Sequence, residues 1–197
     1  MTDRATLDVY DARAADYADL VKKPEPNRHL TDFIDALPKG ARVLDLGCGP
    51  GGSAAEMQKA GLRVDAWDAS DEMAKLGKAI GVNIRVAGFD ALTAQSAYDG
   101  IYANFSLLHA PKADMPGHLA RIATALRSGG LFHIGMKTGT GEKRDTIGRF
   151  YAYYTDAELT GLLAENGLTV LSRATGIDSG LDGVKAPWII MKARLND

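Results

Sequence analysis

The segment Val43-Leu44-Asp45-Leu46-Gly47-Cys48-Gly49-Pro50-Gly51-Gly52 decides the fold, because an apolar run leads directly into a cluster of glycines. The run has the pattern of a buried strand, and the chain after the glycines has the pattern of a helix. Glycines let the backbone turn tightly and approach a ligand, while the helix N-terminus favours a negative group such as a pyrophosphate or a carboxylate. The segment therefore predicts a loop that binds a cofactor through Gly47, Cys48 and Gly49.

The spacing Gly47-x-Gly49-x-x-Gly52 does not identify the cofactor, because NAD and S-adenosylmethionine (SAM) can both use such a loop. Asp45 discriminates between them, since it places a carboxylate at the end of the strand, where a dinucleotide-binding fold usually has an apolar residue. A carboxylate attracts the α-amino group of SAM and repels a pyrophosphate. We therefore favour SAM. The alternative is that Asp45 merely caps the loop.

Two further acidic residues follow predicted strands. Asp68 lies about 20 residues beyond the loop, where a carboxylate can accept both hydrogen bonds of a ribose diol; its alternative is a solvated aspartate in a turn. Asp90 could accept the exocyclic amine of an adenine while Phe89 covers the ring, or it could cap a helix that begins near Ala91. Further expected cofactor contacts are Ala69 and Met73.

From Gly40 onward, short apolar runs alternate with helical stretches, which is typical of βαβ units around a parallel sheet. The expected strands are Arg42–Leu46, Arg63–Trp67, Ile84–Ala87, Gly100–Ala103 and Leu131–Met136. The expected helices are Gly52–Ala60, Asp71–Ile80 with Ser70 as N-cap, and Met115–Arg127 with a stop at Ser128-Gly129-Gly130.

The two ends of the chain differ from this pattern. Residues 5–21 have apolar positions at helical spacing, Lys23-Pro24-Glu25-Pro26 interrupts them, and a second helix is expected over Arg28–Leu37. Near the C-terminus, Thr155-x-x-Glu158 is a capping box for a short helix. Strands are then expected at Leu168–Ala174 and Trp188–Ala193. They should pair antiparallel, because their glycine-rich connection is too short for a crossover helix.

From about Gly40 to Ala193 the chain resembles the class I SAM-dependent methyltransferases, of the small-molecule kind. The matching segments keep the order and spacing of that family's motifs. They are residues 43–51 for the first motif, Asp68 for the second, Gly88-Phe89-Asp90 for the third, Tyr98–Asn104 for the fourth, and Leu126-Arg127-Ser128-Gly129-Gly130 for the turn before the fifth strand.

This resemblance implies a Rossmann-like, doubly wound α/β fold. Its seven-stranded sheet would be mostly parallel with the last strand antiparallel, and helices would cover both faces. We expect a single domain over residues 1–197, with a helical lid at 1–38 and the SAM-binding core at 39–197. The family also implies an N-terminal helix over the cofactor, for which Tyr17 is the favoured contact. Alternatively, Tyr10 and Tyr17 simply pack that helix on the core.

The methyl acceptor is expected beyond the carboxyl ends of the fourth and fifth strands. After the fourth, Asn104 and Phe105 should border the methionine end of SAM. His109 could remove a proton from the acceptor, or it could be a packing histidine. After the fifth, the glycine-rich loop 137–154 carries residues that could recognise an anionic, partly flat substrate: Arg144, Arg149, Tyr151 and Tyr154. The alternative is a solvated loop over packed tyrosines.

Composition bounds the remaining possibilities. A net charge of −2 gives no basic footprint, so nucleic acid is disfavoured as a partner. The single cysteine, Cys48, permits no intrachain disulfide, and the four histidines show no metal-ligand spacing, so we expect no metal. The absence of a signal peptide or an apolar span predicts a cytoplasmic protein with no membrane association. A monomer and a homodimer are both compatible with the sequence.

The sequence favours methyl transfer from SAM to a small molecule whose identity it does not specify. Three alternatives remain: an NAD(P)-dependent oxidoreductase, a SAM-binding protein without catalysis, and a tRNA methyltransferase. The first is weakened by Asp45 and by the lack of a Tyr-x-x-x-Lys pair, and the third by the charge. Methyl transfer needs little beyond holding the acceptor in line with the S–CH3 bond.

Overall fold

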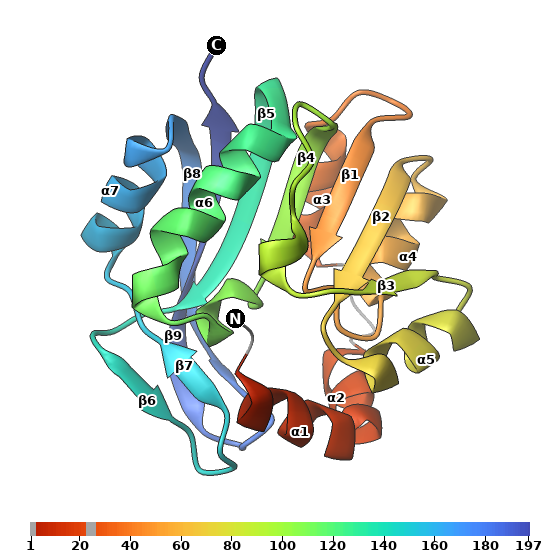
Figure 1. Cartoon of the computed structure of the whole chain (residues 1–197), viewed down its shortest axis with the longest axis vertical. Helices are drawn as coiled ribbons and strands as arrows, with labels where there is room; N and C mark the ends of the chain where they lie inside the picture. The colour runs from red at the N-terminus through yellow and green to blue at the C-terminus, as the bar shows by residue number, and fades with distance from the viewer. Residues whose placement is uncertain (1–2, 23–26) are drawn as a thin grey trace.

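The computed structural model describes residues 3–22 and 27–197, in which seven strands form one sheet in the order β3-β2-β1-β4-β5-β9-β8 (Figure 1). These strands are β1 (Arg42–Leu46), β2 (Arg63–Asp68), β3 (Ile84–Val86), β4 (Tyr98–Asn104), β5 (Leu126–Lys137), β8 (Leu168–Ser179) and β9 (Lys185–Leu195). The strands β1 to β5 pair in parallel, and β9 is antiparallel to both β5 and β8. The predicted fold class is confirmed.

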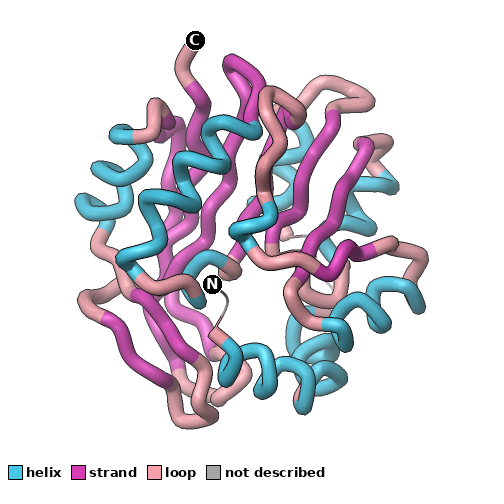
Figure 2. The backbone as a smooth tube through the Cα atoms, viewed as in Figure 1, coloured by secondary structure: helices cyan, strands magenta, loops and turns pink. Residues whose placement is uncertain are grey.

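Helices cover both faces of the sheet (Figure 2). They are α3 (Arg28–Asp35), α4 (Gly52–Lys59), α5 (Asp71–Ala79), α6 (Met115–Ala125) and α7 (Asp156–Glu165). On one face, α6 and α7 bury Leu119 and Leu159 in a cluster that includes Leu44 and Leu46 of β1. On the other face, α3 and α4 bury Phe33 and Met57 against Val43. Alternate residues of β1 thus point to opposite apolar layers, as a strand buried on both sides requires.

Most predicted elements form within one or two residues of their expected bounds. Ser70 caps α5 by accepting a hydrogen bond from the Met73 N–H, and Thr155 forms the expected capping box with Glu158. The larger differences lie in three strands. β9 begins at Lys185 instead of Trp188, and β5 begins at Leu126 instead of Leu131, so the predicted stop at Ser128-Gly129-Gly130 lies within a strand. The helix α6 ends at Ala125 instead of Arg127, because Leu126 already pairs with Tyr98 of β4.

The strand β8 is the third strand that differs, since it continues five residues past the expected Ala174 to Ser179. Residues of the glycine-rich segment, predicted as a connection, pair with the beginning of β9 in register from Thr175↔Ile189 to Ser179↔Lys185. The antiparallel pairing of the two strands is confirmed, and only the tip of the segment remains as a turn.

The N-terminal helix is divided in two, because Arg13 leaves the helical conformation at φ −121° and ψ 27°. The resulting helices α1 (Arg4–Ala12) and α2 (Ala14–Val21) lie below the carboxyl ends of β1 and β2 in Figure 1. By contrast, α3 packs Phe33 against Tyr102 on the sheet, so this part of the expected lid belongs to the core layer. The predicted interruption at Lys23-Pro24-Glu25-Pro26 lies outside the described residues.

The segment 137–154 is more ordered than a glycine-rich surface loop. It contains a hairpin of β6 (Glu142–Arg144) and β7 (Phe150–Ala152), paired antiparallel, with Tyr154 anchored by a bridge to Thr138. The expected glycine-rich loop is therefore corrected to a paired hairpin over residues 142–152. Among the described residues, no helix is both long and apolar enough to cross a membrane.

Candidate active site

The glycine loop between β1 and α4 is held by backbone contacts to the neighbouring strand. The N–H groups of Gly47 and Cys48 donate to the Trp67 carbonyl at 2.8 and 2.9 Å. Gly47 has φ +76° and Gly49 has φ +54°, which glycine adopts readily and other residues rarely do. A Cβ at Gly47 would lie 2.3 Å from the Ser106 Cβ, so this position also has no room for a side chain.

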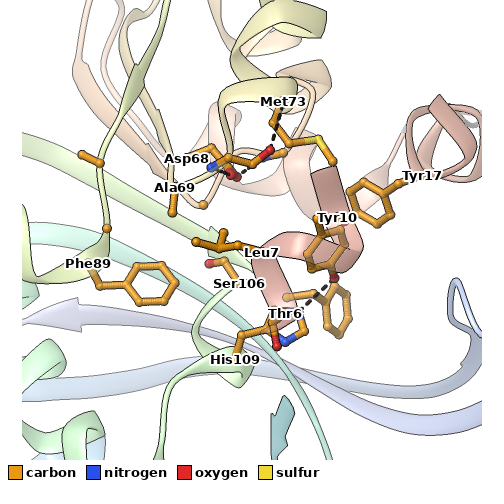
Figure 3. Close-up of a pocket in the computed structure, with 16 residues that line it drawn as sticks. Thr6, Leu7, Tyr10, Tyr17, Asp68, Ala69, Met73, Phe89, Ser106 and His109 are labelled. Carbon is orange, nitrogen blue, oxygen red and sulfur yellow. Dashed lines mark hydrogen bonds between the residues drawn. The ribbon is translucent and has the colours of Figure 1, made fainter. Parts of the chain in front are cut away.

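A pocket opens beside this loop, between the carboxyl edge of the sheet and the lid helices (Figure 3). Nine of its lining residues are predicted site residues: Tyr17, Gly47, Gly49, Asp68, Ala69, Met73, Phe89, Phe105 and His109. No ligand role was predicted for the remaining lining residues, which are Thr6, Leu7, Tyr10, Ser70, Ala87, Gly88 and Ser106. The spacing of the lid residues could have predicted that Thr6 and Tyr10 lie on the same side as Tyr17, since Tyr10 lies four residues after Thr6 and seven before Tyr17.

Asp68 is fixed at the end of β2 by two backbone hydrogen bonds. Its Oδ2 accepts the Gly49 N–H at 2.8 Å, and its Oδ1 accepts the Ser70 N–H at 3.0 Å. Burial raises the pKa of the carboxyl, although these two bonds oppose the shift. The carboxylate therefore has a fixed orientation in the pocket, joining the glycine loop to the start of α5.

Asp45 is 2% exposed and does not line the pocket. The backbone of Ala54, in the first turn of α4, is the group that favours the ionised form of Asp45. The atom Oδ2 has no hydrogen-bond partner among the residues described. Burial, followed by the charge of Asp68, raises the pKa of Asp45 to about 8. With this pKa the carboxyl is mostly protonated at pH 7, and a ligand cation beside Oδ2 would favour its ionised form.

Three other predicted cofactor contacts lie outside the lining of the pocket. Cys48 packs partly buried beside α4, and its thiol points to the Gly49 carbonyl at 3.6 Å. Asp90 is exposed, with Oδ1 3.7 Å from His118 Nδ1. The Oδ1 of Asn104 is 3.0 Å from Nε2 of His133. This contact occupies the amide oxygen of Asn104.

The lid is joined to the β6–β7 hairpin by polar contacts. Thr6 Oγ1 accepts the Phe150 N–H at 2.8 Å, and the Tyr10 hydroxyl accepts from Arg149 at 3.0 Å. Asp3, which caps α1, receives two hydrogen bonds from the Arg144 guanidinium, at 2.8 and 2.9 Å. The hairpin thus holds α1 over the pocket.

His109 lies at the end of the short 3-10 helix η2 (Leu107–His109), which follows β4. Its Nδ1 is 2.7 Å from the Phe150 carbonyl, which only accepts, so Nδ1 carries the proton. Its Nε2 then accepts from the Tyr10 hydroxyl at 2.9 Å. Burial lowers the pKa of His109 to about 4. The imidazole is therefore neutral at pH 7, and it could take a proton from an acceptor only after the Tyr10 hydroxyl moves aside.

This environment predicts a pH-dependent stability. Because the folded pKa of His109 lies below its ordinary value of 6.5, the folded protein binds fewer protons than the unfolded chain between pH 6.5 and 4. The free energy of unfolding should therefore fall as the pH drops through this window. His109→Asn should reduce the slope by up to about 1.4 kcal/mol per pH unit, measured by urea unfolding at several pH values. His133, with a pKa lowered to about 3, titrates in both proteins and serves as an internal control. An unchanged slope would contradict the assignment.

The four residues expected to bind the acceptor do not line this pocket. Arg144 pairs with Asp3, and the buried Arg149 pairs with Asp145 at 2.8 Å. Tyr151 packs on His109 with ring centroids 4.7 Å apart. Tyr154 is 1% exposed within the hydrophobic core.

Comparison with known proteins decides the family. The sequence model of a family described as "Methyltransferase domain" matches residues 20–173, which is most of the chain. The chain belongs to this family. The resemblance to class I SAM-dependent methyltransferases that the motifs indicated is thereby confirmed.

Two curated relatives match part of this methyltransferase domain. A trans-aconitate 2-methyltransferase of Mycolicibacterium gilvum is 33% identical over 115 residues, which are 57% of this chain and 43% of the relative. A ubiquinone biosynthesis O-methyltransferase of Xanthomonas axonopodis pv. citri is 33% identical over 101 residues, 47% of this chain and 41% of the relative. The chain thus spans less than half the length of either protein.

Solved structures share the fold over nearly the whole chain. A 1,6-didemethyltoxoflavin-N1-methyltransferase of Burkholderia thailandensis, solved with bound 1,6-didemethyltoxoflavin and S-adenosylhomocysteine, superposes with a TM-score of 0.80 at 24% identity. The match covers 98% of this chain and 88% of that structure. At this identity the similarity establishes the architecture only.

Proposed function

We propose that this methyltransferase domain transfers a methyl group from SAM to a small-molecule acceptor. The observation that carries the proposal is that residues from separate predicted motifs line one pocket at the carboxyl edge of the sheet. Gly47 and Gly49 follow β1, Asp68 ends β2, and Phe105 follows β4. In open α/β sheets this edge is where ligands bind.

The residues present fit SAM. Asp68 presents a fixed carboxylate for a ribose diol, and Phe89 supplies an apolar wall for the adenine. We infer that Oδ2 of Asp45, which has no partner among the described residues, binds the α-amino group of SAM. Because Asp45 does not line the pocket, a bridging water would connect the two groups. Tyr17 then covers the methionine end, since its ring lies within 3.3 Å of the Cβ position at Gly49.

SAM supplies a methyl group on a sulfonium, which an acceptor atom attacks in line with the S–CH3 bond. The chain then has to orient that acceptor and exclude water. The lid helices exclude water. The space after β4, in which the acceptor would be oriented, is bordered by Phe105, Ser106 and His109. Phe105 has φ +55°, a strained conformation that is frequent at functional sites. The names of the trans-aconitate and 1,6-didemethyltoxoflavin enzymes support a small-molecule acceptor.

Calorimetric titration of the chain with SAM and with NAD tests the cofactor. We expect one SAM site and no NAD binding, and NAD binding without SAM binding would overturn the proposal. Turnover of methyl-labelled SAM with a panel of small acids, phenols, amines and bulk tRNA then tests the reaction. Label transferred to tRNA alone would replace the small-molecule acceptor with RNA, and no transfer at all would indicate a SAM-binding protein without catalysis.

Asp68→Asn should weaken SAM binding about 10- to 100-fold, because one anionic acceptor of the diol is lost while the shape is preserved. The matched control is Asp65→Asn on the same strand, since Asp65 binds Arg42 and Tyr98 away from the pocket. Calorimetry should show unchanged SAM affinity in the control. Equal losses in both variants would mean that Asp68 acts through overall charge and not as a ligand.

A further inference from the structure

A second pocket lies between the hairpin β6–β7 and the turn that joins β8 to β9, which are neighbours at the lower left of Figure 1. Its charged lining comes from the end of β5, from β6 and the residue after it, from the turn between β8 and β9, and from the start of β9. The basic members are Lys137, Lys143, Arg144 and Lys185, and the acidic members are Asp145 and Asp182.

Internal ion pairs neutralise some of these charges. Arg144 holds both carboxylate oxygens of Asp3. Asp145 is paired with the buried Arg149, which approaches its Oδ2 at 2.8 and 2.9 Å. Three lysines then face one remaining carboxylate, Asp182, so the pocket keeps an excess of positive charge.

Lys137 is the deepest of these lysines. It is half-buried at the carboxyl end of β5, with Nζ 4.0 Å from the centre of the Tyr151 ring. Within residues 3–22 and 27–197, neither Lys137 nor Lys143 has a carboxylate at ion-pair distance, whereas Asp182 accepts the Val184 N–H. Lys143 instead lies 5.0 Å from the centre of the Tyr153 ring, which also lines the pocket. Ammonium groups placed against aromatic rings without carboxylate partners retain their capacity to bind an anion.

The pocket adjoins the candidate active site through two buried side chains. Arg149 pairs with Asp145 of the second pocket and donates to the Tyr10 hydroxyl of the first. Tyr151 contacts Lys137 of the second pocket on one side and His109 of the first pocket on the other. Threonine hydroxyls of Thr138, Thr140 and Thr146 add neutral hydrogen-bond donors to the lysines.

We propose that this second pocket binds a small ligand that carries a carboxylate or a phosphate, held by Lys137 and Lys143 with Lys185 at the rim. The ring of Tyr153 forms a flat wall beside the anionic group. The two arginines expected to bind such a ligand are already paired within the protein, and the neighbouring lysines take that role. The site does not depend on the proposed methyl transfer, because anion binding can be measured without SAM.

Calorimetric titration of the full chain with inorganic phosphate and with citrate tests the site. Lys143→Gln and Lys137→Gln should each weaken binding by about tenfold, since each removes one charged donor. Lys143 is exposed, so its replacement should not disturb folding, and Lys78→Gln on α5 is a control with the same charge change. Loss in the two pocket variants with an unchanged control supports the site. No binding of either anion, or equal loss in Lys78→Gln, would overturn it.

A second arm identifies the source of the anionic group. The acceptors are tested in pairs, each consisting of a carboxylic acid and its amide. The rate of methyl transfer from labelled SAM is measured for both members with the wild type and with Lys143→Gln. If the acceptor supplies the anion, acids react faster than amides, and Lys143→Gln removes the preference. If a separate ligand supplies it, both members of a pair react alike while phosphate or citrate still binds. Titration with SAM alone keeps the two proposals distinct, because SAM binding should be unchanged in Lys143→Gln.

Discussion

Gly47→Ala is expected to lower the affinity for SAM by about 30-fold or more. The new Cβ would lie 2.3 Å from Ser106 Cβ and 2.9 Å from its Oγ, and the backbone would have to keep φ +76°. Overpacking and an unfavourable φ each cost about 1 to 3 kcal/mol, and 1.4 kcal/mol corresponds to a factor of ten in affinity. Ser106 cannot move freely, because its hydroxyl donates to the Leu46 carbonyl at 2.6 Å. The loop must therefore shift, and the cofactor contacts shift with it. Calorimetry with SAM measures the loss.

Gly61→Ala separates the effect of the positive φ from the effect of the steric clash. Gly61 also has a positive φ, +85°, but nothing lies within 4 Å of its Cβ position. This control should lose about 1 kcal/mol of stability and keep its affinity for SAM. In the double variant Gly47→Ala/Ser106→Gly the clashing atoms are removed, so part of the affinity should return. Wild-type affinity in Gly47→Ala would show that the loop does not approach the cofactor closely.

The order of the strands in the seven-stranded sheet and of the helices between them could be predicted because each of these elements carries its own local pattern. The apolar run before Gly47 and the capping box at Thr155 need no distant partner to be recognised. The missed boundaries depend on such partners. Leu126 is a strand residue because Tyr98 pairs with it, and β8 continues through Gly176 because β9 lies alongside. Tertiary pairing overrides local propensity at these positions.

The sequence predicted those site residues whose position follows from the order of the strands in the sheet. Asp68 and Phe105 follow strands that end at one edge, so their meeting in a pocket follows from the fold. The direction of a side chain at that edge does not follow. Asn104 turns to His133, and Asp45 turns to the start of α4, through contacts that local sequence does not reveal. The β6–β7 hairpin was hidden by its short strands among glycines and charges.

Arg144 and Arg149 were both predicted to bind the acceptor, but their surroundings in the structure differ. The side chain of Arg144 is about half exposed, whereas that of Arg149 is 2% exposed. Arg149→Ala should therefore lower the free energy of unfolding by about 3 kcal/mol, because it leaves the carboxylate of Asp145 buried without a counter-charge. The change also removes the donor to the Tyr10 hydroxyl, so α1 should exchange its amide hydrogens faster.

Arg144→Ala is the matched control, and it should cost less than about 1 kcal/mol because its ion pair is exposed to solvent. Urea unfolding of both variants measures the difference. Adding Asp145→Asn to Arg149→Ala removes the uncompensated charge and should recover part of the loss, whereas in the wild type Asp145→Asn should destabilise. Equal effects of the two arginine variants would mean that the buried pair does not hold the hairpin against the lid. A larger effect of Arg149, partly reversed by Asp145→Asn, would identify the buried ion pair as the connection between the hairpin and the helix that covers the cofactor pocket.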